Sequence, residues 1–173
     1  MSVESLVYEK GNCERFVLGS VLLNDGLFAE VAAMLPAEAF SIEKHRRIFT
    51  RMAELAKRDE RIDRLTVANE LIVQGQIESI DGMGYLVSLD EGIPELPNIE
   101  SYTRIIREKY DKRRAIFACQ RAINQLLIGA DETPGVIESL DKTLLDIRAG
   151  EDQKHSFRPV FESREFLEAR GVF

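Results

Sequence analysis

Residues 98–128 read NIESYTRIIREKYDKRRAIFACQRAINQLLI and decide the fold, because this run contains neither proline nor glycine. The run predicts a single helix of about 45 Å at 1.5 Å per residue, with Asn98 as a favourable N-cap. One side of that helix is apolar and carries Ile99, Tyr102, Ile106, Tyr110, Phe117 and Ile123. A helix of this length cannot bury its surface against one shorter partner, so we expect it to lean on the rest of the chain or on another copy.

The segment that follows predicts a reversal and a second helix. Gly129, Asp131 and Pro134 are residues that favour turns. Apolar residues then recur at helical spacing, at Val136, Ile137, Leu140, Leu144 and Ile147. The second helix can fold back on the first, which predicts an antiparallel helical hairpin over residues 98–148.

The residues ahead of the hairpin predict several shorter helices. Helical spacing of apolar residues begins at Asn12, and Gly92, Pro94 and Pro97 break the chain before the long helix. We therefore predict an all-α fold: a loose lead-in over 1–11, a compact helical head over 12–97, the hairpin over 98–148 as an oligomerisation arm, and a linker or tail over 149–173. The tail carries four of the nine phenylalanines, at Phe157, Phe161, Phe166 and Phe173.

Charge is distributed unevenly along the 173 residues. The chain is 45% hydrophobic and has a formal net charge of −7, which argues against a protein whose whole surface binds nucleic acid. Residues 65–103 hold seven acids and no Lys or Arg, whereas residues 104–121 hold seven bases and two acids. Two such blocks predict either complementary docking, within the chain or between copies, or two solvated faces without a partner.

The sequence also indicates the cellular compartment of the protein. No apolar run is long enough to span a bilayer and no secretory signal is visible, so we expect a cytoplasmic protein. Cys13 and Cys119 lie far apart and form no metal-binding spacing, so we expect both to be buried, reduced thiols.

The sequence lacks the motifs that are typical of catalytic and cofactor sites. The patterns GxxxxGK[ST], GxGxxG, HExxH and GxSxG are all missing. His45 stands beside two arginines at the start of a predicted helix, where a packed or capping histidine is far more common than a metal ligand. We therefore expect no catalytic residue, no cofactor site and no metal site, and look for an interaction surface instead.

Five strings follow one another along the chain: ERFVLGSVLLND (14–25), HRRIF (45–49), RIDRLTVANEL (61–71), GQIESIDGMGYLVSL (75–89) and NIESYTRIIREKYDKRR (98–114). In this order and spacing they resemble the N-terminal domain of the bacterial replicative DNA helicase of the DnaB type. Three features depart from the family's usual pattern: Asn12-Cys13 ahead of Glu14, Arg64 after Ile-Asp, and Asp81-Gly82 in place of two glycines. These departures indicate a divergent member.

The resemblance implies a role in assembly. In that family the hairpins pair between subunits, and the pairs form a ring-shaped collar, a trimer of dimers, on a ring of ATPase motors. It implies a DnaG-type primase or a helicase loader as partner, and DNA contact that is weak or made through the motor domain. ATP and Mg²⁺ are expected only in that motor domain, which these residues do not contain.

The resemblance and the apolar spacing together define candidate residues. We expect the buried oligomer interface to contain Tyr102, Ile106, Tyr110, Phe117, Ile123, Leu140 and Leu144. A rim that faces a partner or nucleic acid is expected at Arg104, Arg107, Lys112, Arg113 and Arg114.

The sequence thus predicts a non-catalytic domain that assembles a replicative helicase, or a helicase-like ATPase, and binds its partners during DNA replication. A free-standing adaptor that regulates a helicase or primase is an alternative. A further alternative is direct nucleic-acid binding through residues 104–121, against which the acidic total and the lack of a stacking platform weigh.

Overall fold

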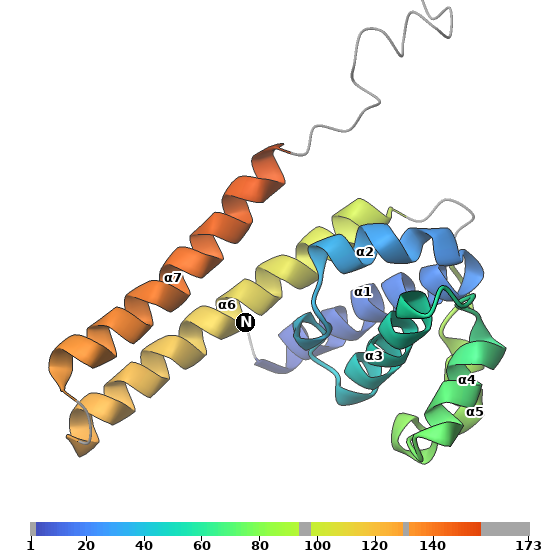
Figure 1. Cartoon of the computed structure of the whole chain (residues 1–173), viewed down its shortest axis with the longest axis horizontal. Coiled ribbons are helices and arrows are strands. Elements are labelled where there is room, and N and C mark those ends of the chain that lie inside the picture. Colours follow the sequence, from blue (N-terminus) through green and yellow to red (C-terminus); the bar gives the residue numbers. More distant parts are fainter. Residues whose placement is uncertain (1–2, 94–97, 130–131, 157–173) are drawn as a thin grey trace, which may run out of the picture. The chain divides into compact units, whose positions relative to one another are not determined.

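The computed structural model describes residues 3–93, 98–129 and 132–156, and within them the side chains from Cys13 to Gly150 (Figure 1). Every regular element in these residues is a helix, so the predicted all-α class is confirmed. The elements are α1 (Val3–Leu23), η1 (Asp25–Leu27), α2 (Phe28–Met34), η2 (Ala37–Ala39), α3 (Glu43–Lys57), α4 (Arg64–Val73), η3 (Glu78–Ile80), α5 (Gly82–Ser88), α6 (Ile99–Ile128) and α7 (Thr133–Ser156). Residues 157–173 of the predicted tail lie outside the described residues, and so do its four phenylalanines.

The chain divides into two compact units, Met1–Tyr110 and Asp111–Phe173, which we call the head and the hairpin. This division lies about three and a half helical turns beyond the predicted boundary at Pro97. The reason is that the first turns of α6 carry Ile99 and Ile106, and both side chains are buried in the core of the head.

The predicted loose lead-in over residues 1–11 is wrong, because α1 begins at Val3 and continues through Gly11. A glycine inside a helix costs only about 1 kcal/mol relative to alanine. Downstream, Val17, Leu18 and Val21 are fully buried, and this packing supports one continuous helix.

The core of the head is built from the apolar sides of α1, α3 and α4. Ile48 and Met52 of α3 and Leu71 of α4 are completely buried. Phe49 lies between two other aromatic rings, with centroid distances of 5.4 Å to Phe28 and 4.8 Å to Phe40. The amphipathic pattern of these helices, apolar at every third or fourth residue, accounts for this core.

Helix α1 approaches the end of α5 so closely that only glycine fits at position 19. A Cβ atom on Gly19 would lie 2.3 Å from the carbonyl oxygen of Leu89 and 2.4 Å from Cδ1 of Ile93. The missing side chain thus sets the distance between α1 and the segment after α5.

Helix α4 is fixed at its start by a capping box. The Asp63 carboxylate accepts hydrogen bonds from the backbone N–H groups of Leu65 and Thr66, and the Thr66 hydroxyl accepts one from the Asp63 N–H. Asp63 is thus the N-cap residue, and Thr66 three residues later completes the box. Beyond the cap, Arg58 pairs with Glu70 at 2.7 Å.

The hairpin combines the second half of α6 with α7. Ala122 of α6 and Val136 of α7 are buried between the two helices, and Leu140, Leu144 and Ile147 are half-buried. Helix α7 runs past the predicted end at residue 148 to Ser156. Pro134 does not belong to the turn as predicted but lies in the first turn of α7, where proline is tolerated.

Candidate functional site

The second half of α6 carries a row of exposed apolar side chains. Ile116, Ile123 and Leu127 are 57%, 55% and 80% exposed. Cys119, also exposed, falls between the first two. The spacing of three and four residues places all four on one side of the helix, roughly opposite the side that packs on α7. We call these residues the α6 stripe.

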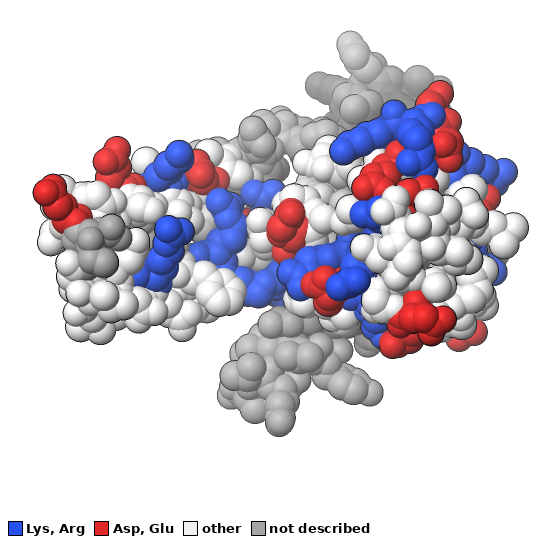
Figure 2. All heavy atoms as spheres, turned by 60° about the horizontal axis from the view of Figure 1, so that its bottom comes forward, with Lys and Arg blue, Asp and Glu red and all other residues white. Residues whose placement is uncertain are grey.

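The outward side of α7 is apolar as well. Ile137 and Leu145 are exposed, and they line a shallow depression together with Pro134 and Asp141. Figure 2 shows the visible face of the hairpin as mostly uncharged, with separate basic and acidic side chains on it. An apolar surface of this kind on a two-helix unit is typical of a protein interface.

A groove of about 290 Å³ runs along the junction of α6 and α7. Arg114, Phe117 and Arg121 line it from α6, and Leu140 and Thr143 line it from α7. The groove therefore combines two guanidinium groups with apolar walls, a combination that suits an acidic amphipathic partner.

The predicted interface residues do not share one surface. Ile106 is buried in the core of the head, and Tyr102 and Tyr110 pack against that same core. The Tyr102 ring stacks on Phe16 of α1 with a centroid distance of 5.7 Å. The expectation that another subunit buries Ile106 is therefore corrected, because its own chain covers it. Tyr102 and Tyr110 are half-buried by their own chain, and their role between subunits remains a prediction.

The other four predicted interface residues lie in the hairpin. Ile123 belongs to the α6 stripe, and Phe117, which is also exposed, lines the groove. Leu140 and Leu144 are half-buried on α7. Their role between subunits remains a prediction, and the apolar period alone did not single out Ile116 and Leu127.

The predicted basic rim is divided between the two units. In the head, Arg104 is exposed and donates to the Ser101 hydroxyl, whereas half-buried Arg107 donates to the backbone carbonyl of Met34. In the hairpin, Lys112 is exposed, Arg113 and Arg114 are half-buried, and Arg114 lies 3.8 Å from the Asp111 carboxylate. The rim is thus not one uniform surface.

Sequence reasoning missed a buried polar chain in the head that joins α1, α3 and α5. Glu14 and His45 are 2% and 1% exposed, with 2.8 Å between the Glu14 carboxylate and His45 Nδ1. His45 Nε2 lies 2.6 Å from the Tyr85 hydroxyl. Glu14 also accepts hydrogen bonds from the N–H and hydroxyl of Ser41 and from the N–H of Ile42.

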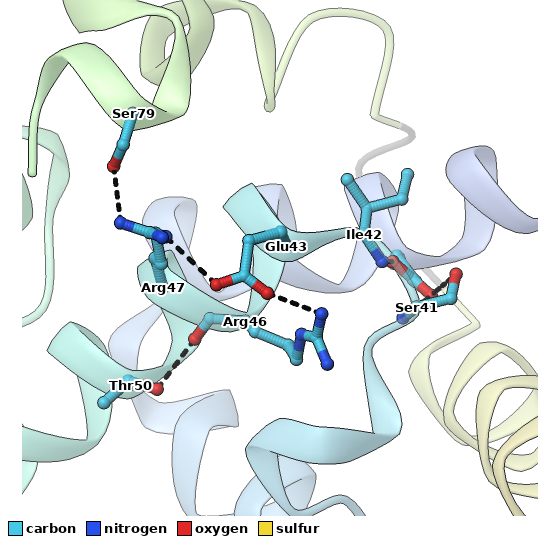
Figure 3. A network of polar contacts seen from close by, with 8 residues as sticks. Ser41, Ile42, Glu43, Arg46, Arg47, Thr50 and Ser79 are labelled. Carbon is cyan, nitrogen blue, oxygen red and sulfur yellow. Dashed lines mark hydrogen bonds and ion pairs between the residues drawn. The ribbon is translucent and has the colours of Figure 1, made fainter.

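Figure 3 shows the polar contacts at the start of α3, the helix that carries His45. Glu43 pairs with both Arg46 and Arg47, and Arg47 reaches the Ser79 hydroxyl at 3.1 Å. The expectation that His45 is a packed histidine is confirmed by its burial. The only signal in the sequence was that Glu14 and His45 each stand in one of the five strings.

Burial alone would raise the pKa of Glu14. The hydrogen bonds from His45 and Ser41 favour the ionised form more strongly, and the pKa is lowered below its ordinary value. Burial raises the pKa of Tyr85. The chain of contacts therefore holds a carboxylate and a neutral phenol in place on either side of the imidazole.

Three acids of the acidic block pair with bases that precede the basic block. Lys44 lies 2.8 Å from Asp81, Arg58 pairs with Glu70, and Arg64 pairs with Asp90.

The prediction of two buried cysteines is wrong for Cys119, which is exposed, and Cys13 is half-buried.

Within the described residues, no three His, Cys, Asp or Glu side chains come together in a way that could hold a metal ion. In the same part of the chain, we find no helix with the length and apolar character needed to cross a membrane.

Comparison with known proteins agrees with the fold. Residues 8–108 match the family model described as the DnaB-like helicase N terminal domain. Replicative DNA helicase DnaB of Geobacillus stearothermophilus is 32% identical over 143 residues, which are 83% of this chain and 31% of that protein. The DnaB of Treponema pallidum is 31% identical over 136 residues, 78% of this chain and again 31% of that protein. This chain therefore spans about a third of the length of these curated relatives.

Solved structures give the same result. The crystal structure of the N-terminal domain of DnaB helicase from Mycobacterium tuberculosis matches with a TM-score of 0.72 and 28% identity, over 78% of this chain and 95% of that one. A DnaB-like replicative helicase, solved in a study of its interactions with primase, matches with a TM-score of 0.63 and 25% identity, over 80% of this chain and 30% of that one. The resemblance carried by the five strings is confirmed, and the chain belongs to the DnaB-like helicase N-terminal domain family.

Proposed function

We propose that this chain is a non-catalytic domain through which the subunits of a replicative DNA helicase pair and bind their partners. The α6 stripe is the observation that carries the proposal. Its apolar side chains lie on a helix whose opposite side already packs on α7, so a second subunit is needed to remove them from water. The family of the chain supports the same role.

The paired state is a twofold dimer in which the α6 stripes of two copies face each other. A twofold interface brings the same patch of both subunits together, and the stripe is self-complementary because it is apolar along its length. Dimers of this kind can assemble further into a collar of three pairs. ATP and Mg²⁺ would act in the remaining two thirds of such a helicase, outside the residues described.

A DnaG-type primase or a helicase loader is the proposed partner of the assembled domain. Support comes from the relative solved in a study of its interactions with primase. The groove between α6 and α7, with Arg114 and Arg121 on its wall, offers such a partner a basic and apolar surface.

Light scattering of the purified chain at several concentrations tests the pairing. We expect the wild type to have the mass of a dimer or a higher even-numbered assembly. The double variant Ile116→Glu/Ile123→Glu should be a monomer, because burying two carboxylates in an apolar interface is strongly unfavourable. Leu23→Glu, which places the same charge on an exposed position at the end of α1 in the head, is the matched control and should keep the wild-type mass.

A wild-type chain that stays monomeric up to high concentration would contradict pairing through this domain alone. If the double variant keeps the wild-type mass, the α6 stripe is not the interface. Binding of purified primase, measured with wild type and double variant, then separates partner binding from pairing.

A further inference from the structure

Helix α4 in the head carries a second apolar side that its own core does not use. Leu65, Ile72 and Val73 are 73%, 59% and 69% exposed. Their spacing of seven and eight residues places them on one side of the helix, while Val67 and Leu71 on the other side are fully buried. An exposed apolar side on a helix that already has a buried one is unusual in a monomeric domain.

The neighbouring helix extends this surface. α5 packs beside α4 (Figure 1), and its residues Met83 and Val87 are both exposed. Figure 2 brings the lower side of Figure 1 forward and shows a broad uncharged area where α4 and α5 lie, with both acidic and basic side chains around its edges. We call this the α4–α5 surface; it consists of Leu65, Ile72, Val73, Met83 and Val87.

The α4–α5 surface is rigidly supported. The Asp63 capping box fixes the start of α4, and the Arg58–Glu70 ion pair holds its second half. The ion pair of Arg64 with Asp90 ties the start of α4 to the residues that follow α5. A preformed surface loses little conformational entropy when a partner binds.

The segment that forms the surface is acidic. Residues 65–93, which belong to the acidic block over residues 65–103, contain five acids and no Lys or Arg. Two arginines from other helices of the head reach this segment: Arg15 donates to the backbone carbonyls of Ser88 and Glu91, and Arg47 donates to the Ser79 hydroxyl. Three of these acids pair with bases from elsewhere in the head, as described above. Glu78, in η3 between the two helices, and Glu91, after α5, are both exposed. They add negative charge that the ion pairs described above do not neutralise.

We propose that the α4–α5 surface docks an amphipathic helix of a partner protein whose apolar stripe is flanked by Lys and Arg. The apolar side chains supply affinity, and basic flanks complement Glu78 and Glu91 and orient the helix. A second copy is a poorer occupant, because a twofold contact would bring two copies of the same acidic segment into one interface. This docking is separate from pairing through the α6 stripe and goes beyond the proposed function.

The probe for a first test is a fluorescein-labelled 18-residue peptide of Leu and Lys, designed as an amphipathic helix and carrying a benzophenone group. The control peptide has Glu in place of every Lys. Fluorescence anisotropy with the full chain should show saturable binding of the Leu/Lys peptide, at least tenfold tighter than that of the Leu/Glu peptide. After illumination, the cross-links should map to α4 and α5.

Variants then locate the contact. Ile72→Ser/Val73→Ser should weaken binding at least tenfold, and Glu78→Gln/Glu91→Gln should weaken it and reduce its dependence on salt. Ile137→Ser/Leu145→Ser, which removes two exposed apolar side chains from α7, is the matched control and should change the affinity less than twofold.

Three outcomes would overturn the proposal. They are equal binding of the Leu/Glu peptide, cross-links outside α4 and α5, and an equal loss of affinity in the α7 control. A lower mass of Ile72→Ser/Val73→Ser in light scattering would assign the surface to a second copy instead. If that variant fails to fold, the positions of the cross-links on the wild-type chain decide whether the peptide binds at α4 and α5. The mass of the wild-type chain tests pairing separately, so failure of this proposal and failure of the proposed function can be told apart.

Discussion

The carboxylate of Glu14 receives four hydrogen bonds, and this determines how the head responds to acid. Its oxygens lie 2.6 and 2.7 Å from the Ser41 N–H and hydroxyl, 3.3 Å from the Ile42 N–H and 2.8 Å from His45 Nδ1. An ionised carboxylate accepts from all four donors, whereas a protonated one must itself donate from one oxygen. In the neutral tautomer of His45 that donates from Nδ1 to Glu14, Nε2 accepts the hydrogen bond of the Tyr85 hydroxyl.

The lowered pKa of Glu14 predicts that the head loses stability in acid. A group whose pKa is lower in the folded than in the unfolded chain contributes stability above its unfolded pKa, near 4.5, and loses it as the pH falls through the folded value. We therefore expect the free energy of unfolding to decline below about pH 5. Urea titrations between pH 3 and pH 7 measure this decline.

Glu14→Gln should destabilise the head at pH 7 by about 2–3 kcal/mol, because its NH₂ group faces donors, and should flatten the decline in acid. Glu38→Gln is the matched control, since Glu38 is exposed, and it should leave both quantities close to wild type. A wild-type decline that survives unchanged in Glu14→Gln would assign the acid response to other carboxylates.

The partners of His45 could not be predicted from the sequence, although its burial could. Glu14 lies 31 residues before His45 and Tyr85 lies 40 residues after it. No local spacing connects three residues on three different helices. Only the packing of α1, α3 and α5 brings them together.

At the scale of single helices, the contact at Gly19 gives a prediction with a built-in control. Gly19→Ala gains about 1 kcal/mol of helix propensity, but its Cβ meets the backbone of Leu89, which cannot rotate away as a side chain can. Overpacking typically costs about 1–3 kcal/mol, and contact with backbone belongs at the upper end. We expect a net loss of about 2 kcal/mol in thermal or urea unfolding.

Gly84→Ala makes the same chemical change inside α5, where a Cβ atom would have no other heavy atom within 4 Å. It should be neutral or stabilise the chain by up to about 1 kcal/mol. If both variants have the same stability, the approach of α1 to Leu89 does not limit the packing of the head.

Local signals predicted some helix ends well and others not at all. Asn98 caps α6 through a 3.1 Å hydrogen bond from the Ser101 N–H, and the predicted end at Ile128 is also confirmed. The start of α1 was missed because Asn12 is a good cap in isolation. The turn chemistry of Pro134 was misjudged because proline suits a turn and the first turn of a helix equally well.

The candidate site shows the same limit. The sequence predicted one apolar side for the whole of α6. In the structure, apolar side chains of its first half, such as Ile106, are buried in the core of the head. In its second half, Ile123 is exposed on the side that does not pack on α7. A period in the sequence shows which residues share a side, yet it does not show which neighbour covers that side in each half.

At the scale of the whole molecule, the two units differ in how much they bury. The head has a continuous core, whereas in the described part of the hairpin only Ala122 and Val136 among the apolar side chains are fully buried. A two-helix unit with so little buried surface is marginally stable by itself. Pairing would therefore contribute a large share of its stability.

Hydrogen exchange should reveal this difference. At low protein concentration we expect the amides of residues 115–128 and 136–147 to exchange at least tenfold faster than those of α3, because local unfolding of the hairpin costs less free energy. At high concentration, protection of the hairpin should rise while that of α3 stays constant. Exchange of the hairpin that is slow and independent of concentration would contradict its dependence on pairing.

Cys119 gives the unmodified chain its own reporter of association. Its thiol lies on the α6 stripe and is exposed to solvent, while Cys13 is half-buried in the head. Alkylating reagents reach a thiol only when nothing covers it, so the rate of maleimide labelling at Cys119 measures the fraction of chains whose stripe is open. A dissociation constant for the subunits can thus be obtained from reaction kinetics on the natural sequence, at concentrations too low for scattering.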